Sequence, residues 1–270
     1  MSVITFYGNS EIETSQTTSM AAIATYLSIE YNYRILVINT KFNDKNLQDC
    51  FWEPSNNRRI RGDLETGING LIKAISSNKI SPEFITNYTR TIFKERLELL
   101  TDYNTPKEDY ERSKECMKSI IKLSNKFYNL VFVDLKGDIE DEYVQEILGL
   151  SNLVVANTSQ RIREIERFLQ ESKKVETLKD RNKIMILIGK YDKYSKYNIK
   201  NLQRAEKLEQ IYGIPYNTLL FEKSNEGHLT DFIIKYRNVN QGSTQKEVSE
   251  AIKNTSLAII DRLKKLQMQV

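Results

Sequence analysis

Short apolar runs alternate with longer amphipathic stretches along the chain. Most of the short runs are four to six residues long, rich in β-branched side chains and apolar on both faces, as is typical of strands that helices cover on both sides. We predict strands at residues 3–8, 34–39, 97–100, 130–134, 153–156, 184–188 and 218–221. Helices are predicted between and after them, at residues 17–31, 68–76, 81–93, 110–127, 139–149, 159–176, 202–212 and 244–268.

This alternation predicts the fold class. Strand, helix and strand repeated in this way require parallel pairing with right-handed crossovers. We therefore predict an α/β fold: a doubly wound, mainly parallel sheet with helices on both faces. No internal repeat and no linker rich in Gly, Pro or Ser divides the sequence. The expected organisation is one α/β domain over residues 1–240, with an amphipathic C-terminal helix at residues 241–270 docked on the same domain.

Composition narrows the class of protein. Hydrophobic residues make up 40% of the 270 residues and charged residues 28%, which excludes a disordered, collagen-like or low-complexity protein. The 40 basic and 36 acidic residues leave a net charge of +4, which does not favour strong nonspecific binding of nucleic acid. No apolar run approaches the roughly 18–20 residues that cross a bilayer, and no signal-peptide pattern opens the sequence. We expect a soluble cytoplasmic protein.

The inventory of cysteine and histidine is small. Cys50, Cys116 and His228 are too few for a disulfide framework or a metal cage. His228 has no Ser or Cys partner in a triad context. Cys50, beside Phe51 and Trp52, is expected to be a small buried hydrophobic side chain rather than a nucleophile.

The loop after the first predicted strand carries the candidate chemistry, because ligands of open parallel sheets sit at the carboxyl ends of the strands. A phosphate-binding P-loop needs glycines for tight turns, a Lys against the β- and γ-phosphates, and a Ser or Thr for Mg²⁺. The segment that begins at Gly8 ends with Thr17 and Thr18 at the start of a helix, as a P-loop does. However, Gln16 stands where the Lys belongs and Ser15 where a Gly belongs.

In the order of its elements the chain resembles the deviant Walker A ATPases of the ParA and MinD group. Within that group it is most similar to the pilus-assembly proteins called TadZ or CpaE. The resemblance covers roughly residues 1–240. The matching segments near the start are the first strand, the threonines Thr17 and Thr18 that close the following loop, the alanine-rich helix start at 20–24 and the second strand at 34–39. Further on they are a Walker B-like strand at 126–134, the next strand at 152–156, and a late Gly-x-Pro turn at 212–215 that precedes a last strand.

The resemblance also implies the residues of a nucleotide site. They are Gly8, Thr14, Ser15, Gln16, Thr17 and Thr18, with Thr17 and Asp134 as Mg²⁺ ligands if nucleotide binds. Lys41 and Lys190 are further candidates for the nucleotide site, as cations that could replace the lost P-loop Lys. The chain departs from the family at most charged and glycine positions of that site. Glu11 replaces the signature Lys, and the adenine-reading Asn falls near Gly189. The loop glycines fall on Ile12, Glu13 and Ser15, and the acidic pair of the second strand falls on Asn39 and Lys41.

These departures predict weak nucleotide chemistry. A charge-assisted hydrogen bond contributes about 1.5–3 kcal/mol, so loss of the P-loop Lys should weaken nucleotide binding by about 10- to 100-fold. Hydrolysis should suffer more, because the charge that develops on the γ-phosphoryl oxygens lacks its cations. We predict a weak or non-hydrolysing binder of ATP or ADP with Mg²⁺, not an efficient ATPase. Two alternatives stay open for Lys41 and Lys190: one of them replaces the lost cation, or both are solvated loop lysines.

The resemblance implies a localisation or scaffold factor for a Tad-type pilus or secretion machine, acting as a homodimer with protein partners of that machine. One alternative is an active ATPase of partitioning or of Min-type cell-division control. Another is an interaction module with a vestigial nucleotide site. Nucleic acid is not an expected partner. The expected location is the cytoplasm, with the inner face of the membrane or a cell pole as a peripheral site.

The C-terminal segment carries an apolar helical stripe at near-heptad spacing, formed by Val248, Ile252, Ile259, Leu263, Leu266 and Val270. The opposite side of the same predicted helix carries basic side chains, among them Lys253 and Arg262. Three roles fit the pattern: docking on the sheet, association with a partner helix or a second copy, and binding to an anionic membrane surface, as the terminal helix of MinD does.

Overall fold

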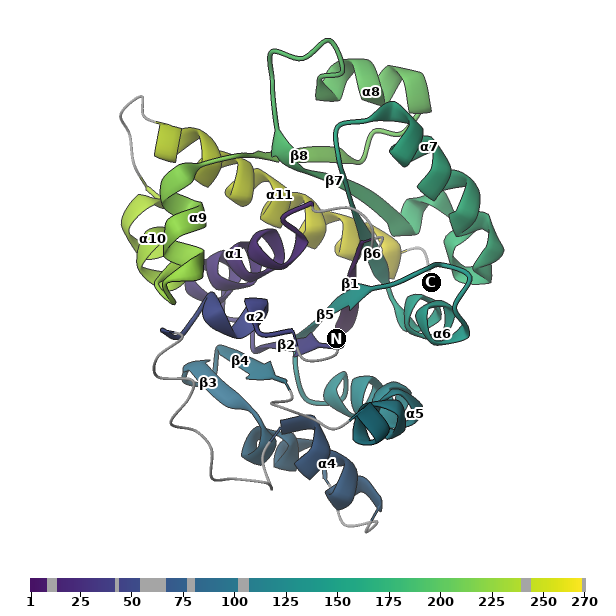
Figure 1. Cartoon of the computed structure of the whole chain (residues 1–270), viewed down its shortest axis with the longest axis vertical. Coiled ribbons are helices and arrows are strands. Elements are labelled where there is room, and N and C mark those ends of the chain that lie inside the picture. The colour runs from purple at the N-terminus through teal and green to yellow at the C-terminus, as the bar shows by residue number, and fades with distance from the viewer. Residues whose placement is uncertain are drawn as a thin grey trace.

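The computed structural model describes residues 1–8, 14–41, 44–53, 67–76, 81–101, 107–238 and 244–268. At its centre lies a sheet with the strand order β3-β4-β2-β5-β1-β6-β7-β8 (Figure 1). Neighbouring strands pair in parallel apart from β3 and β4, which are antiparallel. Helices cover both faces of the sheet, so the predicted doubly wound α/β fold is confirmed.

The strands are short and mostly buried. Their bounds are β1 Ser2–Gly8, β2 Ile35–Asn39, β3 Arg90–Phe93, β4 Leu97–Leu100, β5 Leu130–Lys136, β6 Leu153–Thr158, β7 Ile184–Tyr191 and β8 Ile211–Pro215. The α-helices are α1 Gln16–Glu30, α2 Asn46–Asp49, α4 Gly67–Ser76, α5 Lys107–Ser124, α6 Glu142–Leu150, α7 Ile162–Glu171, α8 Ile199–Glu206, α9 Thr218–Asn225, α10 Leu229–Tyr236 and α11 Thr244–Gln267. Single turns of 3₁₀-helix occur at Ser172–Lys174, Glu176–Leu178 and Arg181–Lys183, and a longer one at Pro82–Tyr88.

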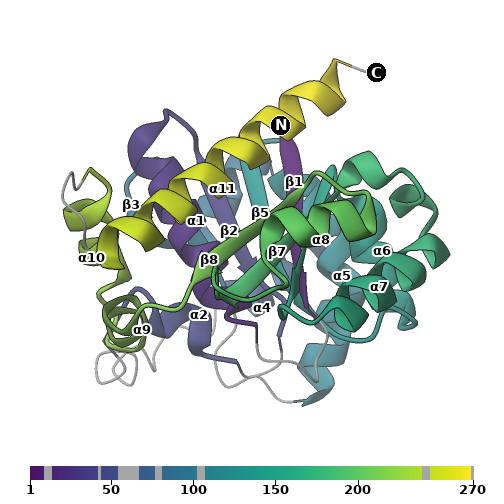
Figure 2. The same cartoon turned by 90° about the horizontal axis from the view of Figure 1, so that it is seen from above.

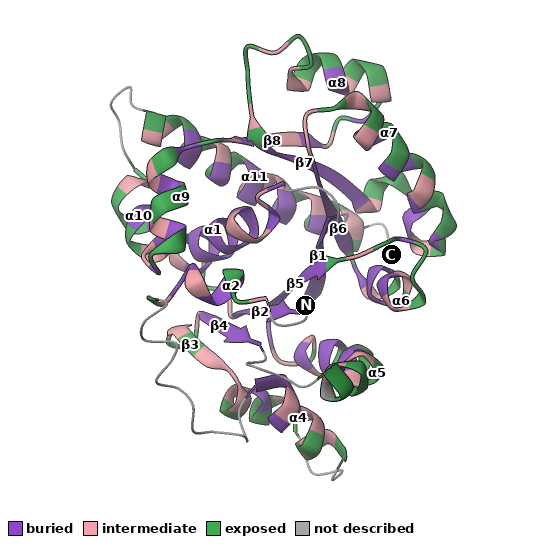
Figure 3. Ribbon diagram, in the orientation of Figure 1, coloured by how far each residue is buried: buried purple, intermediate pink, exposed green. Residues whose placement is uncertain are grey.

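Two hydrophobic cores flank the sheet. Helices α1, α10 and α11 contribute to one core, and α4, α5, α6, α7 and α8 contribute to the other. Successive residues of a strand alternate between the two cores, as the pleat requires: Ile4 and Phe6 of β1 face one core, while Val3 and Tyr7 face the other. Figure 3 shows the central strands as the most continuous buried part of the molecule.

The alanine-rich sequence of α1 follows from its position. This helix lies between the sheet and both α10 and α11, so its surface is covered almost all round (Figure 1). Ala21, Ala22 and Ala24 are fully buried, and so are Met20 and Ile23. Small side chains let neighbouring backbones approach closely without a loss of packing density. The predicted helix at 17–31 is thus confirmed as the innermost helix of the fold.

The segment predicted as a helix at 81–93 is different in the structure. A 3₁₀-helix covers Pro82–Tyr88, and the chain then enters β3, which forms an antiparallel hairpin with β4. Ser81 and Pro82 start the helical turn as the sequence indicates, but the β-branched pair Thr91 and Ile92 suits an edge strand better than a helix. Local start signals therefore extended the predicted helix too far.

The region after β7 contains the largest errors of the prediction. The predicted helix at 202–212 ends at Glu206, because Lys207 takes a left-handed conformation with φ 49°. The expected Gly-x-Pro turn at 212–215 lies within β8, which is itself the last strand. The predicted strand at 218–221 begins α9, because the Asn217 side chain caps this helix by accepting a hydrogen bond from Leu220 N at 2.9 Å. A four-residue apolar run fits a strand or a buried helix equally well.

Helix α11 lies across α1 and β8 (Figure 2). Its apolar stripe is turned toward the core. Val248, Ile252, Ile259 and Leu263 are buried in the same core as α1, and Leu266 packs against that core. Val270 lies outside the described residues. The stripe that suggested affinity for a membrane or a partner helix is therefore used in packing within the chain. No helix in the described ranges is long and apolar enough to cross a membrane.

We expect Ile252→Ala to lower the free energy of unfolding by about 2–5 kcal/mol, because Ile252 is fully buried and the substitution leaves a cavity. Chemical denaturation measures the change. Lys253→Ala is the matched control on the same helix, because Lys253 is exposed, and its effect should stay within about 0.5 kcal/mol. Equal effects of the two substitutions would show that α11 does not pack on the sheet in solution.

Candidate functional site

The connections of the sheet diverge at its carboxyl edge between β1 and β5, and this divergence point is called the crevice below. From β1 the chain passes to α1 on one face, whereas from the neighbouring β5 it passes to α6 on the opposite face. The two loops therefore part between these strands. Open α/β sheets bind ligands at such a point. The site residues predicted at Gly8, Gln16, Thr17 and Asp134 all come from these two strands and from the first turn of α1.

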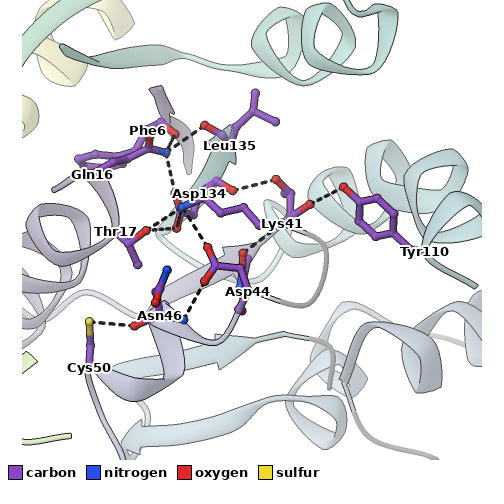
Figure 4. A network of polar contacts seen from close by, with 12 residues as sticks. Phe6, Gln16, Thr17, Lys41, Asp44, Asn46, Cys50, Tyr110, Asp134 and Leu135 are labelled. Carbon is purple, nitrogen blue, oxygen red and sulfur yellow. Dashed lines mark hydrogen bonds and ion pairs between the residues drawn. The ribbon is translucent and has the colours of Figure 1, made fainter. Parts of the chain in front are cut away.

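Asp134 lies near the end of β5, in register with Phe6 of β1 and Asn39 of β2. Its side chain is fully buried, at 0% exposure. A buried carboxylate is costly unless hydrogen bonds and an opposite charge compensate it. Both of its oxygens are partnered by side chains from other elements (Figure 4).

Gln16 uses its amide to hold the sheet together at this edge. Gln16 Nε2 lies 2.6 Å from Asp134 Oδ1, 2.8 Å from the Phe6 carbonyl oxygen and 2.9 Å from the Leu135 carbonyl oxygen. The side chain is buried and turned into the sheet. The absence of a side chain at Gly8 leaves room for the Gln16 amide, because a Cβ at Gly8 would lie 2.0 Å from Gln16 Oε1. The residue at the P-loop Lys position thus binds the protein's own backbone and carboxylate.

Thr17 and Lys41 occupy the second oxygen of Asp134. Thr17 Oγ1 donates to Asp134 Oδ2 at 2.9 Å, and Lys41 Nζ donates to the same oxygen at 2.8 Å. Lys41 Nζ also donates to Thr17 Oγ1 at 2.7 Å and lies 3.7 Å from Asp44 Oδ2. The side chain of Lys41 is only 11% exposed. The structure therefore does not support the alternative in which Lys41 is a solvated loop lysine.

The backbone around Lys41 is held by polar contacts of its own. The Asn39 side chain accepts from Lys41 N at 3.0 Å and donates to the Asp44 carbonyl oxygen at 2.8 Å. Thr40 Oγ1 donates to the Asp134 carbonyl oxygen at 2.8 Å, and Tyr110 Oη donates to the Thr40 carbonyl oxygen at 3.1 Å. Burial raises the pKa of Tyr110, which keeps its phenol protonated as a donor.

The sequence contains some signal for these contacts but not for all. Asn39 is recognisable in the sequence as a departure from the family's acidic pair. Its role in shaping the turn before Asp44 can be seen only in the structure. Tyr110 belongs to α5 and lies 70 residues after Thr40 in the chain, so no local sequence pattern connects the two residues.

The loop before α1 packs on the end of β7. A Cβ at Gly189 would lie 1.7 Å from the backbone oxygen of Thr14, so these two segments touch without a side chain between them. Ser15 takes a left-handed conformation, with φ 54°, where a P-loop has glycine. The backbone of Thr14 therefore lies directly against Gly189 and leaves no room for a side chain at that position.

The other predicted site residues are less closely involved. Thr18 is half-buried in the first turn of α1. Lys190 is exposed at the end of β7, with φ 54°. The departures at Glu11, Ile12 and Glu13 lie outside the described residues.

Cys50 lies near this network but has no chemistry to add. It is buried, and its Sγ is 3.2 Å from the Asn46 carbonyl oxygen. Burial raises the pKa of the Cys50 thiol to about 12, and the charge of Asp134 acts in the same direction. The thiol therefore stays protonated at neutral pH and acts as the small buried side chain that the sequence indicates.

Solved structures of similar fold identify the architecture. A ParA family ATPase from Chlorobium tepidum matches with a TM-score of 0.68 and 15% identity, over 95% of this chain and 98% of that chain. MinD in the MinC:MinD complex of Aquifex aeolicus matches with a TM-score of 0.66 and 16% identity, over 97% of this chain and 96% of that chain. MinD of Pyrococcus horikoshii, solved with Mg-ADP, matches with a TM-score of 0.65 and 12% identity, over 97% of this chain and 98% of that chain. No protein-family model and no curated protein sequence matches.

The chain has the fold of the ParA and MinD ATPases. At these identities the likeness establishes the fold alone, and it agrees with the order of elements on which the resemblance in the sequence rests. In this fold, Asp134, Thr17 and Gln16 lie together where the end of β5 meets the start of α1.

The ParA/MinD fold implies Mg²⁺ as a cofactor, and the residues can be tested for it. Mg²⁺ demands near-octahedral oxygen ligands at about 2.0–2.1 Å. The ligands predicted for it, Thr17 Oγ1 and Asp134 Oδ2, lie 2.7 and 2.8 Å from Lys41 Nζ. A dication on both oxygens would stand beside the ammonium in a buried site, where like charges repel strongly. With Lys41 in this position, the residues do not fit Mg²⁺.

We expect Gly189→Ala to lower the free energy of unfolding by about 1–3 kcal/mol, because the new Cβ meets the Thr14 backbone rather than a flexible side chain. Urea denaturation at neutral pH measures this. Gly149→Ala is the control, because a Cβ at Gly149 has nothing within 4 Å. In helix α6 that substitution should be neutral or stabilise by up to about 1 kcal/mol. A neutral Gly189→Ala would mean that the loop does not rest on β7.

Proposed function

We propose that this chain is a non-hydrolysing relative of the ParA and MinD ATPases, which serves as a localisation or scaffold factor rather than as an enzyme. The observation that carries the proposal is the state of Asp134. This carboxylate is fully buried, and Gln16, Thr17 and Lys41 already partner both of its oxygens. A hydrolysing site of this fold needs cations that are directed at the transferred phosphoryl group.

Nucleotide binding, as distinct from hydrolysis, keeps some support. The crevice is present, and α1 begins in it with backbone N–H groups that suit an anion. Against this, Gln16 is turned into the sheet and Thr14 rests on Gly189. The missing P-loop Lys costs about 10- to 100-fold in affinity. We infer weak binding of ATP or ADP at millimolar concentration.

The process is inferred from the resemblance in the sequence. The order of elements is similar to that of the TadZ proteins, so we propose a role in placing a Tad-type pilus or secretion machine. In this proposal the chain acts as a homodimer with protein partners of that machine, at the cytoplasmic face of the membrane or at a cell pole. In this proposal residues 1–240 correspond to a nucleotide-binding type of domain, and helix α11, Thr244–Gln267, docks on it.

The proposal predicts that purified protein releases phosphate from Mg-ATP no faster than a sample without protein. Phosphate release is measured beside Asp134→Asn and beside Asp138→Asn, which removes an exposed carboxylate four residues further along. Phosphate release that disappears in Asp134→Asn and persists in Asp138→Asn would contradict the proposal and favour the alternative of an active partitioning or Min-type ATPase.

Thermal unfolding separates a weak binder from a vestigial site. A ligand that binds only the native state raises the melting temperature by mass action, so a retained site gives a shift that grows with ADP or ATP between 1 and 10 mM, concentrations on the order of a weak Kd. No shift over this range would leave the interaction module with a vestigial site as the better description. CTP, tested at the same concentrations, controls for nonspecific effects of a nucleoside triphosphate.

A further inference from the structure

We propose that the ammonium group of Lys41 is a resident replacement for the divalent cation in this crevice. Its Nζ lies 2.8 Å from Asp134 Oδ2, 2.7 Å from Thr17 Oγ1 and 3.7 Å from Asp44 Oδ2. These oxygens are the kind that a magnesium ion would take in a carboxylate and hydroxyl site. The ammonium joins the same groups and neutralises Asp134 without a metal.

The charges at the site favour one cation and exclude a second. Asp134 is fully buried, so it needs a positive partner, and the described residues place Lys41 within ion-pair distance of it. Asp44 is also largely buried, with 19% of its side chain exposed. Lys41 thus stands between two carboxylates. A dication would have to displace the ammonium from both, and this lysine is attached to the chain next to them.

The position of Lys41 is built by the surrounding fold. Asn39 accepts from the Lys41 backbone N–H, and Thr40 is tied both to β5 and to α5 through Asp134 and Tyr110. Both neighbours on the N-terminal side therefore hold the backbone that carries the ammonium. A lysine in a solvated loop would have rotamer freedom that this arrangement removes. The replacement cation is consequently part of the folded structure.

This inference goes beyond the proposed function, because it concerns a cation and does not depend on whether nucleotide binds. It implies that the charge of the crevice stays the same whatever the Mg²⁺ concentration. It also implies that removal of the Lys41 side chain creates a divalent-metal site from Asp134, Thr17 and Asp44. Metal binding without nucleotide tests this separately from phosphate release.

The experiment titrates the full chain with Mn²⁺ alone and follows the free ion by electron paramagnetic resonance. Wild type and Lys41→Ala are compared with Lys45→Ala, which removes the same charge from an exposed position in the same segment. We expect Lys41→Ala to bind Mn²⁺ at least about tenfold more tightly than wild type, while Lys45→Ala behaves as wild type. The double variant Lys41→Ala/Asp134→Asn should lose the gained binding, because a neutral amide is a poor ligand for a hard cation.

Thermal unfolding of the same variants gives a second readout. Removing one partner of a buried ion pair should lower the melting temperature of Lys41→Ala by roughly 5–15 °C. Addition of 10 mM MgCl₂, on the order of a weak metal Kd, should recover part of that loss by mass action in Lys41→Ala and change wild type little.

Two results would overturn the proposal. One is wild type binding Mn²⁺ as tightly as Lys41→Ala, and the other is a melting temperature of Lys41→Ala equal to that of Lys45→Ala. If Lys41→Ala does not fold, the wild-type titration still decides. Mn²⁺ binding by wild type that Asp134→Asn weakens at least about tenfold contradicts a resident ammonium, and its absence supports it.

Discussion

A carboxylate without solvent exposure at the end of a central strand constrains everything around it. Moving an ion out of water costs several kcal/mol even after the surroundings relax, and this cost is offset only by an opposite charge and by hydrogen bonds of good geometry. The Asp134 carboxylate receives both, from Gln16 and Thr17 at the start of α1 and from Lys41 just after β2. The backbone carbonyl of Asp134 accepts from Thr40, which Tyr110 of α5 holds in turn. The crevice is therefore held together by the residue that catalysis would have needed.

This arrangement shows that the fold and the state of its polar edge depend on different interactions. The sheet, the crossovers and the helix that follows β1 depend on apolar burial, which the substitutions at Gln16 and Lys41 do not disturb. The chemistry depends on where a few charges point. Gln16 is turned inward and Lys41 lies on Asp134, so the buried carboxylate is neutralised within the chain. Fold and activity are separable for this reason.

Several elements could be predicted from local patterns, and their errors have a common cause. Strands such as β1 and β5 are buried on both faces, so continuous apolar runs identify them. The edges of the sheet lack that signal. β3 is half-exposed, and β8 contains Gly213 and Pro215, so neither resembles a central strand. The run at residues 218–221 is apolar for another reason, because it begins a helix that Asn217 caps.

The sequence by itself determined the central strands, the helices between most of them, and the position of Gln16 at the start of the helix after β1. These follow from short-range periodicity and from residue identity at fixed positions. Only the tertiary structure decided where Gln16 and Lys41 direct their polar groups, and that Thr14 rests on Gly189. Each of these contacts joins residues far apart in the chain. Their geometry is set by the packing of whole elements, and no local sequence pattern encodes it.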